Sequence, residues 1–166
     1  MADLKELMLR APRLTLAVAE SLTCGRLQAR IGATSGASEY FLGGITAYTI
    51  EQKARHLGID PGEARAVNAV SARVAEQMAR GACALFGSDI GAATTGYAEP
   101  APQLGVEFPF AWWGLARRLA DGQFAAASGR VECRGLSRVQ AQEKVAGAAF
   151  DALVAWVREP AAARTT

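Results

Sequence analysis

Ser21 is the residue whose type and position best suit nucleophilic chemistry. It lies within residues 19–25 (AESLTCG), after the apolar run of residues 14–18 and before a helical pattern that starts near Arg26. A hydroxyl at such a junction lies beside free backbone N–H groups and the positive end of a helix dipole. The same position also suits a serine that only caps the helix. From the residues alone, both roles remain open for Ser21.

A serine nucleophile needs a base within hydrogen-bond reach, and two candidates follow it along the chain. Lys53 follows Tyr48, which ends a strand-like segment, and lies on the first turns of the next predicted helix. A Ser–Lys pair can replace the hydrolase triad where burial lowers the pKa of the lysine. His56 is the single histidine, so a histidine-based hydrolase would depend on it alone. Each could instead be an ordinary solvated helix residue.

Composition limits the classes of protein to consider. The chain has 166 residues, of which 51% are hydrophobic and 20% charged, which predicts one domain over residues 1–158 and a flexible tail over 159–166. The net charge of +2, without a block of Lys or Arg, argues against nucleic-acid binding and suits a small anionic substrate. No apolar run is long enough to span a membrane, and no secretory signal is recognisable, so we expect a cytoplasmic protein.

The cysteines and the histidine offer no metal site. Cys24, Cys83 and Cys133 are widely spaced and odd in number, which is typical of free thiols in a reducing compartment. Neither a CxxC nor an HxxxH spacing occurs, so we expect no bound metal.

Apolar periodicity predicts alternating strands and helices. The expected helices cover residues 3–10, 23–32, 50–57, 71–86 and 137–157; the expected strands cover 14–19, 41–48, 90–95, 110–117 and 124–133. The last two strands should form a hairpin around Asp121-Gly122. This order predicts an α/β fold with a mixed, mostly parallel sheet. Its ligand site should lie at the carboxyl ends of strands, near residues 21–23, 48–53 and 94–96.

Four blocks of the sequence resemble the CinA C-terminal-domain family in order and spacing. They are residues 19–25 (AESLTCG), 43–53 (GGITAYTIEQK), 69–71 (AVS) and 95–100 (TGYAEP), and the resemblance extends over about residues 14–155. It implies a three-layer α/β/α fold and hydrolysis of nicotinamide mononucleotide (NMN) to nicotinate mononucleotide and ammonia, without metal or cofactor. In this family the domain often follows a larger N-terminal domain. No such domain precedes the four blocks in this sequence, so we expect a standalone form.

The resemblance implies roles for individual residues. Ser21 matches the nucleophile and Lys53 the general base, while Tyr48 would orient this pair or stack on the substrate ring. Backbone N–H groups from Thr23 to Gly25, at the start of the helix, would hold the oxyanion.

Further residues match substrate-binding positions of the family. Thr95 and Gly96 begin its glycine-rich loop, and Arg138 lies in a segment that resembles its late Gly-Asp-Arg, where a phosphate partner is expected.

The chain departs from the family pattern after Ala98. Glu99, Pro100 and Pro102 replace a glycine-rich loop, and prolines remove N–H donors while an inward-facing acid would repel an anion. A second hypothesis therefore stays open, in which the chain is a degenerate member that binds a ligand or acts as a regulatory or assembly domain. The course of residues 96–105 should separate the two hypotheses.

Three further expectations concern single side chains. Cys24, at a family glycine, should be a small buried hydrophobe rather than a reactive thiol. Glu20 is either a site residue or a structural ion-pair partner. An apolar surface on the last helix, with Trp156 beside Val157, favours a homo-oligomer.

Overall fold

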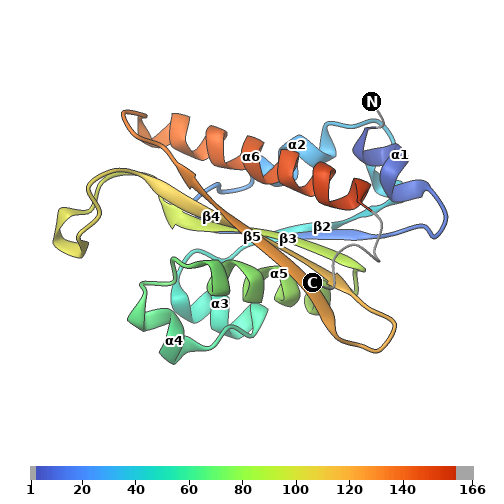
Figure 1. Cartoon of the computed structure of the whole chain (residues 1–166), viewed down its shortest axis with the longest axis horizontal. Coiled ribbons are helices and arrows are strands. Elements are labelled where there is room, and N and C mark those ends of the chain that lie inside the picture. The colour runs from blue at the N-terminus through green and yellow to red at the C-terminus, as the bar shows by residue number, and fades with distance from the viewer. Residues whose placement is uncertain (1–2, 160–166) are drawn as a thin grey trace.

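A five-stranded sheet lies between two layers of helices in the computed structural model, which describes residues 3–159 (Figure 1). The strands are ordered β2-β1-β3-β4-β5 across the sheet. Their bounds are Leu16–Glu20 (β1), Phe41–Thr46 (β2), Ile90–Tyr97 (β3), Phe110–Arg118 (β4) and Phe124–Glu132 (β5).

The helices divide evenly between the two faces of the sheet (Figure 1). One face carries α1 (Leu4–Leu9), α2 (Arg26–Gly32) and α6 (Arg138–Arg158); the other carries α3 (Ile50–Leu57), α4 (Pro61–Ala66) and α5 (Ala72–Phe86). Short 3₁₀ turns cover Ala37–Glu39 and Pro102–Leu104. The predicted three-layer α/β/α fold is confirmed.

The sheet is mixed, as predicted. β1 pairs in parallel with β2 and β3, whereas β4 pairs antiparallel with both β3 and β5. β5 therefore runs in the same direction as β1, β2 and β3. The expected hairpin joins β4 and β5, and the carboxyl ends of the three parallel strands meet at one edge, where a ligand site is expected.

β1 is an interior strand of the sheet, between β2 and β3. All five of its residues are buried, because helices cover both faces of the sheet. The first four residues form the continuous apolar run that is typical of such a strand. Glycines let α5 approach the sheet closely: a Cβ at Gly91 or Gly114 would collide with the backbone of Ala79 or Ala75. The neighbouring strands and α5 are therefore held in a close-packed unit.

The last helix packs inward. Trp156 and Val157 are buried in the core between α6, α1 and the sheet, where they join Leu16, Ile31 and Leu153. The sequence argument for a homo-oligomer from these two residues is therefore wrong, because the apolar stripe of α6 is used within the chain.

Several elements differ from the expectations by one or two residues at their ends, and two differences are larger. α2 begins at Arg26 instead of residue 23, because residues 21–25 form a turn in which Gly25 has a φ of +92°. α4 is not among the expected helices, although Asp60 caps it and Pro61 is its first residue, a sequence pattern that favours a helix start. Of the predicted tail, residues 160–166 lie outside the described part of the chain.

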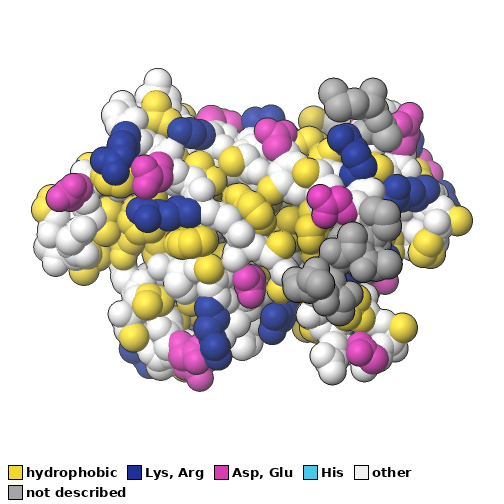
Figure 2. Space-filling view, in the orientation of Figure 1, with side chains coloured by type: hydrophobic (Ala, Val, Ile, Leu, Met, Phe, Trp, Pro, Cys, Tyr) yellow, Lys and Arg dark blue, Asp and Glu magenta, His cyan; other side chains and the backbone are white. Residues whose placement is uncertain are grey.

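The described surface carries both signs of charge. On the face drawn in Figure 2, Lys and Arg side chains are interspersed with Asp and Glu side chains. Within residues 3–159, no helix has the length and apolar character needed to cross a bilayer.

Candidate active site

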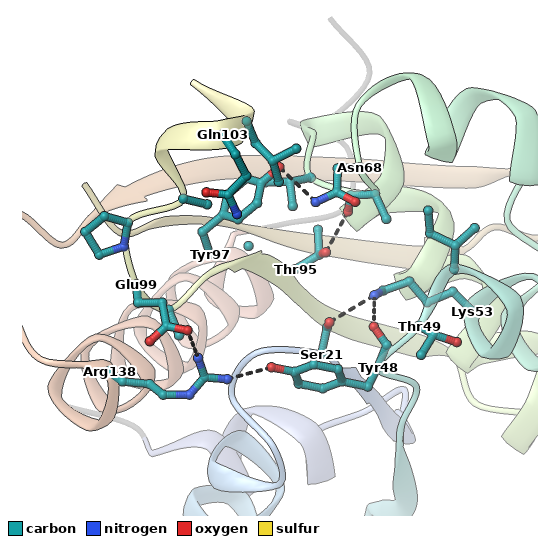
Figure 3. A pocket seen from close by; sticks show the side chains of 18 of the residues that line it. Ser21, Tyr48, Thr49, Lys53, Asn68, Thr95, Tyr97, Glu99, Gln103 and Arg138 are labelled. Carbon is teal, nitrogen blue, oxygen red and sulfur yellow. Dashed lines mark hydrogen bonds and ion pairs between the residues drawn. The ribbon is translucent and has the colours of Figure 1, made fainter. Parts of the chain in front are cut away.

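Ser21 and Lys53 form a buried pair at the edge of the sheet where the parallel strands end (Figure 3). Ser21 directly follows β1, and its backbone N–H donates to the carbonyl of Thr94 on β3 (3.0 Å), which fixes its position. The Lys53 Nζ donates to the Ser21 Oγ at 2.9 Å. The two residues are only 6% and 3% exposed, so the contact is shielded from solvent.

The start of α3 positions the lysine. Thr49 caps the helix by accepting a hydrogen bond from the N–H of Gln52. The carbonyl oxygen of Tyr48 accepts a second hydrogen bond from the Lys53 Nζ at 2.8 Å. The amine is thus held between the serine hydroxyl and a backbone carbonyl.

Burial changes the acidity of Lys53. It lowers the pKa of the ammonium group from 10.5 to about 8, because desolvation disfavours the charged form. In the described part of the chain, no carboxylate lies within ion-pair distance of this amine to oppose the shift. Roughly a tenth of such a lysine is neutral at pH 7, and the neutral form can accept a proton.

A cavity of about 500 Å³ opens above this pair. Its walls come from five parts of the chain: Ser21, residues 48–51 with Lys53, residues 68–70, residues 95–101 with 103–104, and Arg138. The volume is within the range of small-molecule sites. The predicted site residues Ser21, Tyr48, Lys53, Thr95, Gly96 and Arg138 are therefore brought together.

One wall of the cavity has an unusual backbone. Asn68 and Ala69 both have left-handed φ angles, +48° and +56°, which residues other than glycine rarely adopt. The buried Thr95 hydroxyl donates to the Ala69 carbonyl (2.6 Å), and the Asn68 amide donates to the Tyr97 hydroxyl (3.1 Å). Sequence reasoning missed Asn68, although asparagine tolerates this conformation better than most residues. Such strain is common at functional sites.

The family model described as the CinA C-terminal domain matches residues 1–157. The chain belongs to this family. The predicted resemblance is confirmed, and it extends slightly beyond the blocks that carried it.

Relatives of this CinA domain share its sequence and its fold. The CinA-like protein of Chlorobaculum tepidum is 37% identical over 150 residues, covering 89% of this chain and 35% of that protein. The CinA-like protein of Frankia casuarinae is 51% identical over 89 residues, covering 54% of this chain and 21% of that one. This chain thus spans about a third or less of the length of these relatives. Their names state no reaction.

Two solved structures show the same architecture. The CinA superfamily protein from Klebsiella pneumoniae 700603 is 26% identical, with a TM-score of 0.79 over 90% of this chain and 91% of that one. The competence damage-inducible protein A from Klebsiella pneumoniae subsp. pneumoniae is 27% identical, with a TM-score of 0.76 and coverage of 99% and 100%. The CinA fold thus accounts for nearly the whole chain.

In this CinA domain, Glu20 caps α2. Its carboxylate accepts hydrogen bonds from the N–H groups of Gly25 (3.0 Å), Leu27 (3.1 Å) and Gln28 (2.9 Å), and its side chain is fully buried. The expected ion-pair role is therefore wrong, and Glu20 does not line the cavity as a site residue either. The carboxylate occupies the positive end of α2 and leaves that end unavailable to a substrate anion.

Thr23 and Gly25 do not line the cavity. The Thr23 hydroxyl is buried against that of Thr94 (2.7 Å). The N–H of Cys24 donates to the Ser21 carbonyl (3.2 Å), and that of Gly25 is taken by Glu20. The expected oxyanion site at residues 23–25 is therefore wrong for these two donors, because the turn uses them itself.

Cys24 is exposed, so its expected burial is also wrong. It has a φ of +48° within the turn, and its Sγ donates to the Ser21 carbonyl at 3.3 Å. The left-handed turn directs this side chain outward instead of into the core.

Two other chemistries find no support. His56 is exposed, contacts the Gln52 side chain (3.0 Å) and does not line the cavity, so it is not the base for Ser21. Across residues 3–159, no cluster of three or more His, Cys, Asp or Glu side chains is arranged to hold a metal ion.

Arg138 and Glu99 meet at the mouth of the cavity (Figure 3). Arg138 is the first residue of α6, which a capping box at Ser137 and Gln140 begins. Its guanidinium donates to the Glu99 carboxylate (2.8 Å) and to the Tyr48 hydroxyl (2.8 Å). The residue expected to bind phosphate thus already holds an anion of the chain itself.

Most of the segment 96–105 lines the cavity, with residues 96–101, 103 and 104. Its backbone donors, however, turn inward on the loop: the N–H of Ala101 bonds Val106, that of Leu104 bonds Ala101, and that of Gly105 bonds Pro102. These donors are therefore not free to cradle a phosphate.

Proposed function

We propose that this CinA-family chain is an amidohydrolase in which Ser21 is the nucleophile and Lys53 the general base. The reaction proposed is hydrolysis of the carboxamide of NMN, or of a related nucleotide amide, to the acid and ammonia. The observation that carries the proposal is the buried contact of 2.9 Å between the Lys53 Nζ and the Ser21 Oγ. An ordinary helix lysine would be exposed to solvent, and a lysine is rarely buried unless a carboxylate pairs with it.

The geometry supports a two-step reaction. Neutral Lys53 accepts the Ser21 proton while the Oγ attacks the carboxamide carbon, and the tetrahedral intermediate forms. Lys53 then gives this proton to the departing nitrogen, so ammonia leaves and an acyl ester remains on Ser21. A water molecule, deprotonated by Lys53, attacks the ester, and the returned proton restores the serine.

Gly96 is the best donor for the oxyanion. The Thr94 carbonyl faces β1, since it accepts from the Ser21 N–H. Backbone groups of alternate residues in a strand face the same side, so the Gly96 N–H points past the end of β1, towards Ser21. Gly96 also lines the cavity. This donor replaces the expected one at residues 23–25.

Tyr48 supports the pair through its backbone. Its carbonyl oxygen holds the Lys53 Nζ, while its half-exposed ring lies at the cavity edge. The ring is placed to stack on a planar pyridine amide, and the hydroxyl already contacts Arg138.

The ion pair between Glu99 and Arg138 favours a second function, ligand binding or regulation without hydrolysis. The ion pair between Glu99 and Arg138 occupies the expected phosphate position, which suits a chain that binds a ligand or regulates a partner without hydrolysis. The two functions differ in whether amide nitrogen is released.

The deciding experiment is ammonia release from NMN by the purified chain, beside Ser21→Ala and Lys53→Ala. Turnover that both substitutions abolish supports the amidohydrolase. Release no greater than that of Ser21→Ala would contradict it, and turnover that survives Lys53→Ala would remove the proposed base. His56→Ala is the matched control, because His56 lies outside the cavity.

Other expectations remain predictions. They are a cytoplasmic location, a homo-oligomer, action on a small nucleotide-like substrate without a cofactor, and no binding to nucleic acid or membrane.

A further inference from the structure

The cavity mouth balances its charges. Of the charged side chains that line the cavity, Glu51 and Glu99 are acidic, and Lys53 and Arg138 are basic. Lys53 is buried against Ser21, and Arg138 is paired with Glu99 at 2.8 Å. A negatively charged ligand group therefore meets no uncommitted cation along this lining.

The ion pair is exposed, but it cannot simply be replaced by a phosphate. The side chains of Arg138 and Glu99 are 44% and 63% exposed, so an entering ligand can separate them. Glu99 would nevertheless stay close, because it lies between Ala98 and Pro100, both of which line the cavity. A phosphate on Arg138 would thus lie beside a carboxylate, and the repulsion would offset the attraction.

Five positions of the loop provide no backbone donor that could offset this repulsion. Pro100 and Pro102 have no N–H group, and the N–H groups of Ala101, Leu104 and Gly105 are bonded within the loop. These five positions of the loop therefore offer no free donor to a phosphate.

We propose that Glu99 is a specificity-determining residue that makes this site select pyridine carboxamides without a phosphate, such as a nicotinamide nucleoside, over the phosphorylated nucleotide. The pyridinium ring is positively charged in both the nucleoside and the nucleotide, so the phosphate alone decides this selectivity. The inference rests on the proposed amide hydrolysis, but it departs from the nucleotide named there and makes the unphosphorylated nucleoside the favoured substrate.

The test compares two compounds that differ only by the phosphate, NMN and nicotinamide riboside. Their dissociation constants are measured by calorimetry on the Ser21→Ala chain, alone and with Glu99→Gln. Glu107→Gln is the matched control, because Glu107 is an exposed acid in the same region that does not line the cavity.

We expect the riboside to bind at least as tightly as NMN. Glu99→Gln should shift the ratio of the two constants towards NMN by about tenfold, the size of one removed unfavourable charge contact, while Glu107→Gln leaves it within about twofold. Tighter binding of NMN by the Ser21→Ala chain, no binding of either compound, or equal shifts in both acid variants would overturn the inference.

Turnover separates this inference from the proposed function. If the wild-type chain releases ammonia from neither compound, amide hydrolysis fails, whereas the binding ratio still tests Glu99. If it releases ammonia from both but Glu99→Gln leaves the ratio of kcat/KM values unchanged, only the specificity inference fails.

Discussion

The Lys53 Nζ lies 2.9 Å from the Ser21 Oγ, although 32 residues separate them in sequence. Ser21 directly follows β1, and α3, which carries Lys53, begins shortly after the neighbouring strand β2. Because β1 and β2 run in parallel, their carboxyl ends meet at one edge of the sheet. The parallel pairing is therefore what brings the two residues together, and the following predictions depend on it.

The activity should rise with pH. Burial lowers the pKa of Lys53 to about 8, and only the neutral amine accepts the serine proton. Between pH 6 and 7.5, kcat/KM should increase about tenfold per pH unit, and it should level off above about pH 8.5. A profile that is flat over this range would show that Lys53 does not act as the base.

Replacing Lys53 by methionine should abolish activity and stabilise the fold. The folded state has the lower pKa, so below about pH 8 the buried ammonium is charged in both states and destabilises the folded one. Urea unfolding of Lys53→Met at pH 7 should give a free energy of unfolding roughly 1 kcal/mol or more above wild type.

The same linkage makes the wild-type chain more stable in alkali. Between about pH 8 and 10.5 the unfolded chain binds more protons at this site than the folded chain. The free energy of unfolding should therefore include a contribution that rises with pH in this window, and the advantage of Lys53→Met should shrink there. An advantage independent of pH would contradict this origin.

Tyr48→Phe should impair the reaction only mildly. The Lys53 Nζ is held by the backbone carbonyl of Tyr48, which the substitution retains, whereas only the contact of the phenol with Arg138 is lost. Steady-state kinetics should show a loss in kcat below about tenfold, against roughly a thousandfold or more for Ser21→Ala. A loss as large as that of Lys53→Ala would place the phenol in the chemistry.

Glu20→Ala should destabilise the domain severely. It removes the acceptor of three backbone N–H groups at the start of α2 and leaves them in a buried position. Thermal or urea unfolding should show a loss of roughly 3 kcal/mol. Arg26→Ala is a suitable control, since the Arg26 side chain forms a surface ion pair with Glu143 and one hydrogen bond to the Thr23 carbonyl, and caps no helix. Equal losses in the two variants would contradict the capping role.

The sequence by itself determined the helix starts, the hairpin and the family of this protein. The expected helices begin at Ser71 and Ser137, which are the residues that cap α5 and α6. Asp121-Gly122 likewise predicts the hairpin of β4 and β5, because caps and turns depend on neighbouring residues. The order of the motifs also pointed to the family and to the sheet edge that holds Ser21, Tyr48 and Lys53.

Only the tertiary structure decided what depends on contacts between distant segments. The turn after β1 directs the Cys24 side chain outward, bonds the Cys24 N–H to Ser21 and gives the Gly25 N–H to Glu20, so two of the expected oxyanion donors are already used. Arg138 meets Glu99 across 39 residues. The burial that lowers the pKa of Lys53 likewise exists only once the strands have paired, because desolvation depends on the packed surroundings and not on neighbours in sequence.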